Sequence, residues 1–198
     1  MPVDNASGAK PNGLRIAAAQ SEVLGLELTR FAVAVGLVGD SNRVQGNLIG
    51  TNAAGDAGLG NANGVRVESG TGNRIGGIAS NAPNVISGNT NYGVETVGPA
   101  TATTVSGNRI GTNPAGTASR PNGTGVRVDG GSTQNVIGGT NTAERNLISG
   151  NQNYGVRLID PGTSQNTVEG NYIGTTADGA GSLRTFTSAG VGISVTAS

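Results

Sequence analysis

Short runs of alternating aliphatic and polar residues recur along most of the chain, and Gly, Asn, Ser and Thr separate them. Val65-Arg66-Val67 and Val126-Arg127-Val128 are two such runs. An alternation with a period of two residues is typical of a strand that buries one of its faces. The pattern therefore predicts an all-β chain that is built from many short strands.

The runs belong to an internal repeat. Residues Asn84–Asn89 match Asn146–Asn151, which lie 62 positions later. Residues Val44–Thr51 match Val105–Thr112 after 61 positions and Val168–Thr175 after a further 63. Repeats of this length indicate stacked structural units. Each unit divides into two halves of about 31 residues with three predicted strands in each half.

An odd number of strands per half excludes a simple up-and-down meander, because every second unit would then run in the opposite direction. A continuous coil avoids this problem, since each strand lies parallel on its counterpart one turn later. We therefore expect a right-handed, single-stranded parallel β-helix with about six coils and three short strands per coil. Residues 1–12 form a leading segment, and residues 13–198 form the β-helix. The strands expected in one unit are Val65–Val67, Arg74–Gly76, Val85–Ser87, Val94–Val97, Thr104–Ser106 and Arg109–Gly111.

Aliphatic residues at equivalent positions are expected to fill the coil. Val44, Val105 and Val168 each stand three residues before an Asn, as do Ile86 and Ile148. Burying each of them contributes about 1.5–3 kcal/mol. The Asn residues that follow Gly are expected at tight bends, because Asn tolerates a left-handed backbone and its side chain can bond to the neighbouring coil. Stacked Asn ladders are a known device of this kind.

The two ends follow the same scheme less regularly. Leu14–Ile16 reads as a first strand, and Glu22–Thr29 contains the next two strands. Phe31–Val35 is expected to start the second coil, and Gly190–Val195 opens another coil. Uncovered ends expose strand edges that can pair with another chain. The sequence is therefore expected to be either a fragment of a longer solenoid or a unit that stacks end to end.

A competing fold remains. Asn12-Gly13, Asn63-Gly64 and Asn122-Gly123 are typical hairpin turns, so an antiparallel propeller or sandwich is the alternative. Propeller blades hold four strands in about 40–50 residues, which does not match three strands in about 31.

Composition excludes several classes of function. The 198 residues include 36 glycines and 22 asparagines, but no His and no Cys. Their absence excludes the usual zinc sites, a nucleophile activated by His, and disulfides. Twelve basic and twelve acidic residues cancel, which argues against nucleic-acid binding. The longest apolar run, at residues 31–39, is too short to span a membrane, and residues 1–5 lack the basic and apolar pattern of a secretion signal, so the sequence predicts neither a membrane span nor a signal peptide.

The aligned units resemble bacterial right-handed parallel β-helix repeat proteins, which include exported and surface proteins and share the pectate-lyase-like fold. The resemblance is carried by Asn84–Asn89, by Gly107–Thr112 and by Gly125–Val128, and it covers nearly the whole chain. It implies an extracellular or cell-surface location. The expected function is that of a non-enzymatic adhesin or fibre module whose partner is another copy or a neighbouring β-helix segment. The alternative is a β-helix that binds or cleaves an acidic polysaccharide.

Outward residues of the first strand in each coil form the candidate binding face. The predicted column contains Arg15, Ala34, Arg66, Glu95, Arg127 and Arg157, and a second column contains Glu68, Val97, Asp129 and Ile159. The resembled carbohydrate enzymes use this face, and Arg binds carboxylates bidentately. The competing interpretation, which is favoured, is a surface ladder of ion pairs. The carboxylates are expected to be exposed and to have a pKa lowered by Arg, so no catalysis is expected.

The aromatic side chains give weaker indications of function. Tyr172 occupies the outward position of Leu48 and Arg109, and it could belong to a stacking surface. Tyr92 and Tyr154 stand at strand entries, where they are expected to cover the edge of the core. Phe31 and Phe186 are expected to be buried.

Three longer loops, at residues 52–63, 113–124 and 176–189, are expected to stack on one edge of the rod. Insertions confined to one face often mark a binding face, although the composition of these loops favours simple turns. Asp56 or Asp178 could contribute to calcium binding, but one carboxylate per loop is too few for a tight site. No cofactor is therefore expected.

Overall fold

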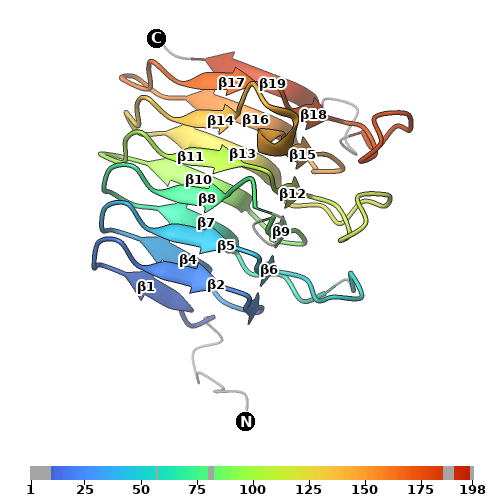
Figure 1. Cartoon of the computed structure of the whole chain (residues 1–198), viewed down its shortest axis with the longest axis horizontal. Coiled ribbons are helices and arrows are strands. Elements are labelled where there is room, and N and C mark those ends of the chain that lie inside the picture. The colour runs from blue at the N-terminus through green and yellow to red at the C-terminus, as the bar shows by residue number, and fades with distance from the viewer. Residues whose placement is uncertain (1–9, 57, 80–82, 185–189, 197–198) are drawn as a thin grey trace.

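The computed structural model describes residues 10–56, 58–79, 83–184 and 190–196. The chain winds into a parallel β-helix with three strands per coil, and its coils stack from the N-terminus at the bottom of Figure 1 to the C-terminus at the top. Six coils are complete, and a last strand begins the next coil. This architecture confirms the fold expected from the repeat.

The strands form three parallel sheets, which we call A, B and C in the order in which each coil visits them. Sheet A contains β1 (Leu14–Ile16), β4 (Val33–Leu37), β7 (Asn63–Val67), β10 (Tyr92–Val97), β13 (Thr124–Asp129), β16 (Tyr154–Ile159) and β19 (Val191–Thr196). Sheet B contains β2 (Glu22–Leu24), β5 (Arg43–Gln45), β8 (Arg74–Gly76), β11 (Thr104–Ser106), β14 (Val136–Gly138) and β17 (Thr167–Glu169). Sheet C contains β3 (Glu27–Leu28), β6 (Leu48–Ile49), β9 (Val85–Ile86), β12 (Arg109–Ile110), β15 (Leu147–Ile148) and β18 (Tyr172–Ile173). A short 3₁₀ helix, η1 (Thr142–Glu144), precedes β15.

Aliphatic side chains in register fill the interior of the coil. Val65, Val94, Val126 and Val156 lie opposite one another on consecutive strands of sheet A, and all four are fully buried. The corresponding residues of sheets B and C are also buried, except that Val168 and Ile173 in the last complete coil are only partly buried. The inward positions predicted from the sequence are therefore confirmed.

Asparagine ladders occupy the three corners of the coil. At the second corner, between sheets B and C, the Asn108 side-chain amide donates to Asn146 Oδ1 at 3.0 Å, and the Asn108 backbone N–H donates to the same oxygen at 3.0 Å. Asn84 makes the equivalent pair of bonds to Asn108. The ladders comprise Asn42, Asn73, Asn135 and Asn166 at the first corner, Asn47, Asn84, Asn108, Asn146 and Asn171 at the second, and Asn61, Asn89, Asn122 and Asn151 at the third. The bends and the bonds to the neighbouring coil expected at asparagines that follow Gly are confirmed. The left-handed backbone expected there is found at the preceding glycines, such as Gly107 and Gly150 with φ of +70°, and at no Asn in the described part of the chain.

The hydrogen bonds of the ladders all run in the same direction along the rod, and one of the ladders is interrupted. Each asparagine oxygen accepts from the coil before it, and the first coil has Ser21, Leu26 and Phe31 at its corners, whose backbone N–H groups donate to Asn42, Asn47 and Asn61. The first-corner ladder is interrupted in the fourth coil by Thr103, which is fully buried. Asn73 Nδ2 and Thr103 Oγ1 have no hydrogen-bond partner there. Asn42 Nδ2, one coil before Asn73, also has no partner, although the Asn42 backbone N–H donates to Asn73 Oδ1. The first corner is therefore less completely hydrogen-bonded than the other two.

The second coil starts later than the sequence indicates. Phe31 is a half-buried corner residue rather than the first residue of a strand, because its backbone N–H donates to Asn61 Oδ1. Strand β4 begins at Val33, and Val35 and Leu37 are its residues opposite Leu14 and Ile16. The expectation for Phe186 lies outside the described residues.

The longer loops stack along one edge of the rod, at the right of Figure 1, as expected. The first two loops are joined by a hydrogen bond from Arg120 Nε to Gly55 O, and the last two by a bond from Ala177 N to Gly116 O at 3.0 Å. Residues 185–189 of the last loop lie outside the described residues. The stacked loops build a wall beside the outer face of sheet C.

Candidate functional site

The outer face of sheet A carries a column of in-register residues. Opposite one another on consecutive strands lie Arg15, Gly36, Arg66, Glu95, Arg127, Arg157 and Ser194. The prediction that Ala34 belongs to this column is wrong, because β4 begins two residues later than expected and places Gly36 opposite Arg15. Ala34 is fully buried. The five charged members of the predicted column do lie together.

The second column begins with an ion pair across two coils. Glu68, which follows β7, has its Oε2 atom 3.4 Å from Arg15 Nη2. Gly36 lies between them, and a Cβ atom at Gly36 would stand 3.3 Å from Glu68 Oε1. The absence of a side chain at Gly36 therefore opens the path that Glu68 takes to Arg15. Val97 and Asp129 lie opposite each other further along this column.

Two carboxylates on this face are paired with arginines. Arg66 Nε lies 3.0 Å from Glu95 Oε2, and Arg127 Nη2 forms an ion pair with Asp129 Oδ2. These pairs agree with the expected ladder of ion pairs. Both carboxylate side chains are only 7% exposed, however, so the expectation of exposed carboxylates is wrong.

Burial also reverses the expected direction of the pKa shifts. Loss of hydration raises the pKa of Glu95 above its ordinary value, and the neighbouring Arg66 opposes this only in part. Burial likewise raises the pKa of Asp129, although Arg127 lowers it. Asp129 Oδ1 is buried without a hydrogen-bond partner. The burial of these carboxylates was not predicted, because the spacing of residues along the chain does not reveal how long Arg and Tyr side chains pack around them.

Two tyrosines hold the arginines of this face. The Arg127 guanidinium lies 4.9 Å from the centre of the Tyr92 ring and donates to the Tyr92 hydroxyl. The Arg157 guanidinium lies 4.6 Å from the centre of the Tyr154 ring. The half-buried tyrosines thus serve as platforms for cations, a role that the sequence analysis missed. The sequence did contain an indication of this role, because a Tyr stands three positions before the column residue in both coils.

Tyr172 belongs to a different face. It lies on β18 in register with Leu147, Arg109 and Leu48, as expected, and therefore on sheet C. The predicted site residues consequently divide between two outer faces of the rod. Tyr172 stacks against Arg145, whose guanidinium is 4.1 Å from the ring centre. Together they line a surface cavity of about 290 Å³, and sequence reasoning did not identify the contribution of Arg145 to it.

The loop aspartates serve local turns. Asp56 Oδ2 accepts from Asn52 Nδ2 at 2.7 Å, and Asp178 Oδ1 accepts from the Thr176 hydroxyl and from Ala180 N. These hydrogen bonds lower the pKa of Asp178. Within the described residues, no three His, Cys, Asp or Glu side chains gather into a group that could hold a metal ion.

Comparison with known proteins finds no matching family model, no matching curated protein and no matching solved structure. In the described part of the chain, no helix has the length and apolar character needed to cross a membrane.

Proposed function

We propose that this chain is a non-enzymatic structural module, a stiff β-helix rod of an extracellular or cell-surface protein. The observation that supports this role is the continuity of the interior. The aliphatic core and the Asn ladders at the second and third corners run through nearly all of the coils. Such an interior resists bending and presents the outer sheets as fixed surfaces.

The proposal includes end-to-end association through sheet A. Strand β19 has no charged residue, and Val191, Ile193 and Val195 are 39%, 46% and 64% exposed. An apolar edge strand of this kind is a template for pairing with another chain. The partner edge is β1 of a second copy. Because the corner residues of the first coil offer no asparagine oxygen, such a junction would lack the ladders and would be reversible.

Sedimentation analysis over a range of concentrations, combined with electron microscopy, tests this association. The wild-type chain is expected to form longer rods as its concentration rises, whereas Val195→Lys and Ile193→Lys remain monomeric. Ile78→Lys is the matched control, because Ile78 is 69% exposed and lies away from the last strand. A wild-type chain that stays monomeric at every concentration contradicts the assembly role, as does an equal effect of the control substitution.

A second function is favoured by one observation on sheet A. Glu95 and Asp129 are buried carboxylates with raised pKa values, and Arg157, on the strand after Arg127 of the same face, has no carboxylate partner among the described residues. A buried carboxyl group with a raised pKa, on the same face as an arginine without a carboxylate partner, suits binding or cleavage of an acidic polysaccharide.

Glycan-array binding at low salt, followed by an assay for newly formed chain ends, tests this second function. Arg127→Ala and Arg157→Ala are expected to abolish binding, and Glu95→Gln to abolish any cleavage while binding persists. Binding that is unchanged in both arginine variants would show that the polysaccharide does not bind to this face of sheet A. This outcome would leave the structural role untouched.

A further inference from the structure

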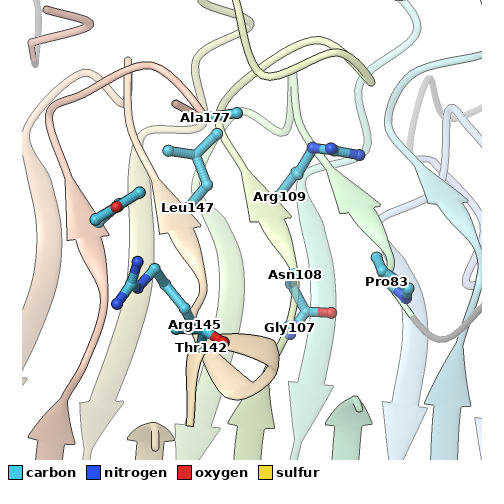
Figure 2. A pocket seen from close by; sticks show the side chains of 9 residues that line it. Pro83, Gly107, Asn108, Arg109, Thr142, Arg145, Leu147 and Ala177 are labelled. Carbon is cyan, nitrogen blue, oxygen red and sulfur yellow. The ribbon is translucent and has the colours of Figure 1, made fainter. Parts of the chain in front are cut away.

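The cavity on sheet C differs in chemistry from the rest of the surface. It lies over β12, β15 and β18, with η1 on one side and the stacked loops on the other. Figure 2 shows Arg145 and Thr142 at one end, Arg109 across from them, and Leu147 and Ala177 beside the loop. The volume of about 290 Å³ is that of a site for one small molecule.

Two guanidinium groups line this cavity, and neither has an acidic partner among the described residues. Arg145 is held in place, because its Nε atom donates to Gly170 O at 2.8 Å while its guanidinium stacks on Tyr172. Arg109 is half-buried and makes no side-chain hydrogen bond or ion pair within the described residues. The cavity therefore holds two partly desolvated positive charges.

The neighbouring carboxylate does not neutralise these charges. Glu144 is adjacent to Arg145 in the chain, but its Oε2 atom accepts from the Asn141 backbone N–H at 3.0 Å and from Asn141 Nδ2 at 3.1 Å. This capping box keeps the carboxylate within η1. The cationic lining is consequently available to an anion from outside.

The rest of the lining is apolar. Leu147, Ala177 and Pro83 contribute aliphatic groups, and the Tyr172 ring lies beside Arg145. A bare inorganic ion would leave this part of the cavity unfilled, whereas a ring would cover it. Thr142 contributes a hydroxyl at the rim.

We propose that this cavity binds a carboxylate carried on a six-membered ring, either a sugar acid or an aromatic acid. The Arg145 guanidinium, which is held against Tyr172, binds the carboxylate oxygens, because guanidinium groups match carboxylates in geometry as well as charge. Arg109, on the other side of Leu147, adds to the positive charge of the cavity. The ring packs against Leu147 and Ala177. This site is distinct from the face of sheet A and does not depend on the proposed structural role.

Calorimetric titration with two acids and their neutral counterparts tests the proposal. Glucuronate is compared with glucose, and benzoate with benzamide, on the full chain at low salt. At least one acid is expected to bind while its neutral counterpart does not. Arg145→Gln is expected to weaken that binding about tenfold or more, which is the usual loss for a charged hydrogen bond, and Arg109→Gln is expected to weaken it by a smaller factor.

Arg74→Gln is the matched control, because Arg74 is an exposed arginine on sheet B and the substitution removes the same charge. It is expected to bind the acid as the wild-type chain does, and a thermal melt confirms that each variant is folded. Binding by glucuronate identifies a sugar acid, and binding by benzoate alone identifies an aromatic acid. The proposal is overturned if neither acid binds, if inorganic sulfate binds as tightly as the acids, or if the control weakens binding equally.

Discussion

Glycine at the end of a strand shows how one residue governs contacts between coils. Gly111 follows β12 with φ of +91°, a conformation that other residues rarely adopt. A Cβ atom there would lie 2.3 Å from Asn151 Oδ1 and 2.4 Å from Ser149 O. The glycine is therefore required both by its backbone conformation and by the ladder of the next coil.

Two glycine substitutions separate the effect of the backbone conformation from the effect of the close contact. Gly111→Ala is expected to destabilise the chain by about 3 kcal/mol or more, because strain and a clash act together. Gly25→Ala is the control, since Gly25 has a positive φ but nothing within 4 Å of its Cβ position. It is expected to cost only about 1 kcal/mol, measured by chemical denaturation. Equal losses would mean that the close approach to Asn151 is unimportant.

The buried carboxylate of Glu95 predicts a pH dependence. Because burial raises the pKa of Glu95, the folded chain binds its proton more tightly than the unfolded chain does. Its contribution to stability is therefore greatest at acidic pH and is lost as the pH rises through the raised pKa. Glu95→Gln is expected to reduce the fall in melting temperature that occurs as the pH rises from the ordinary carboxyl range through the raised pKa of Glu95. Glu22→Gln, at an exposed carboxylate, is expected to leave the curve unchanged.

Residue spacing predicted the positions of the side chains in the sheet A column but not their environment. The inward and outward sides of the strands followed from the alternation, as Val65 and Arg66 illustrate. Glu95 pairs with Arg66 of the preceding coil, and Arg127 of the next coil stacks on Tyr92, so the contacts around Glu95 join three coils. Pairwise spacing within one coil cannot encode a contact of this kind.

At the scale of the elements, the corner ladders explain why asparagine is so frequent. An asparagine side chain satisfies a backbone N–H of the preceding coil, a side-chain amide and a backbone carbonyl at one bend. Thr103 cannot do this, because its hydroxyl does not reach Asn73. The first corner is consequently the weakest of the three in the fourth coil.

Completing the interrupted ladder is expected to stabilise the rod. Thr103→Asn supplies an oxygen for Asn73 and an amide for Asn135, a gain of about 1 kcal/mol that a thermal melt can detect. Thr103→Val is the control, because it removes the unpartnered hydroxyl without giving Asn73 a partner. If Thr103→Asn melts no higher than Thr103→Val, the ladder is not the source of the stability.

The register of the strands was predictable to different degrees along the chain. The repeats in the middle of the chain fixed β7 to β12 within one or two residues of the predicted ranges. In the second coil, the aliphatic run at residues 31–35 offered two equivalent starting points for a strand. The hydrogen bonds of Phe31 and Ala32 to Asn61 and Pro11 decided between them, and these partners are distant in the sequence.

For the whole molecule, contacts between neighbouring coils imply that damage stays local. Val126 is fully buried between Val94 and Val156. Val126→Asp is expected to destabilise the chain by about 3 kcal/mol or more, since it buries an unpaired charge. Hydrogen exchange should accelerate first in the fourth to sixth coils and only later in the first two, because each coil contacts only its neighbours.

Ala53→Asp serves as the control for this experiment, because Ala53 is exposed in the first of the stacked loops. Its exchange pattern is expected to match that of the wild-type chain. Uniform acceleration along the chain in Val126→Asp would indicate that the rod unfolds as a single cooperative unit.

The parallel register between coils also bears on how such a chain can change in length. Each strand pairs with its counterpart about one coil further along, and the second and third corners repeat the same bonds at every step. A gene duplication that copies two consecutive coils would therefore insert them with their core and their hydrogen bonds already satisfied. Rod length is then a property that recombination can adjust in fixed steps while the surfaces on either side of the insertion keep their chemistry.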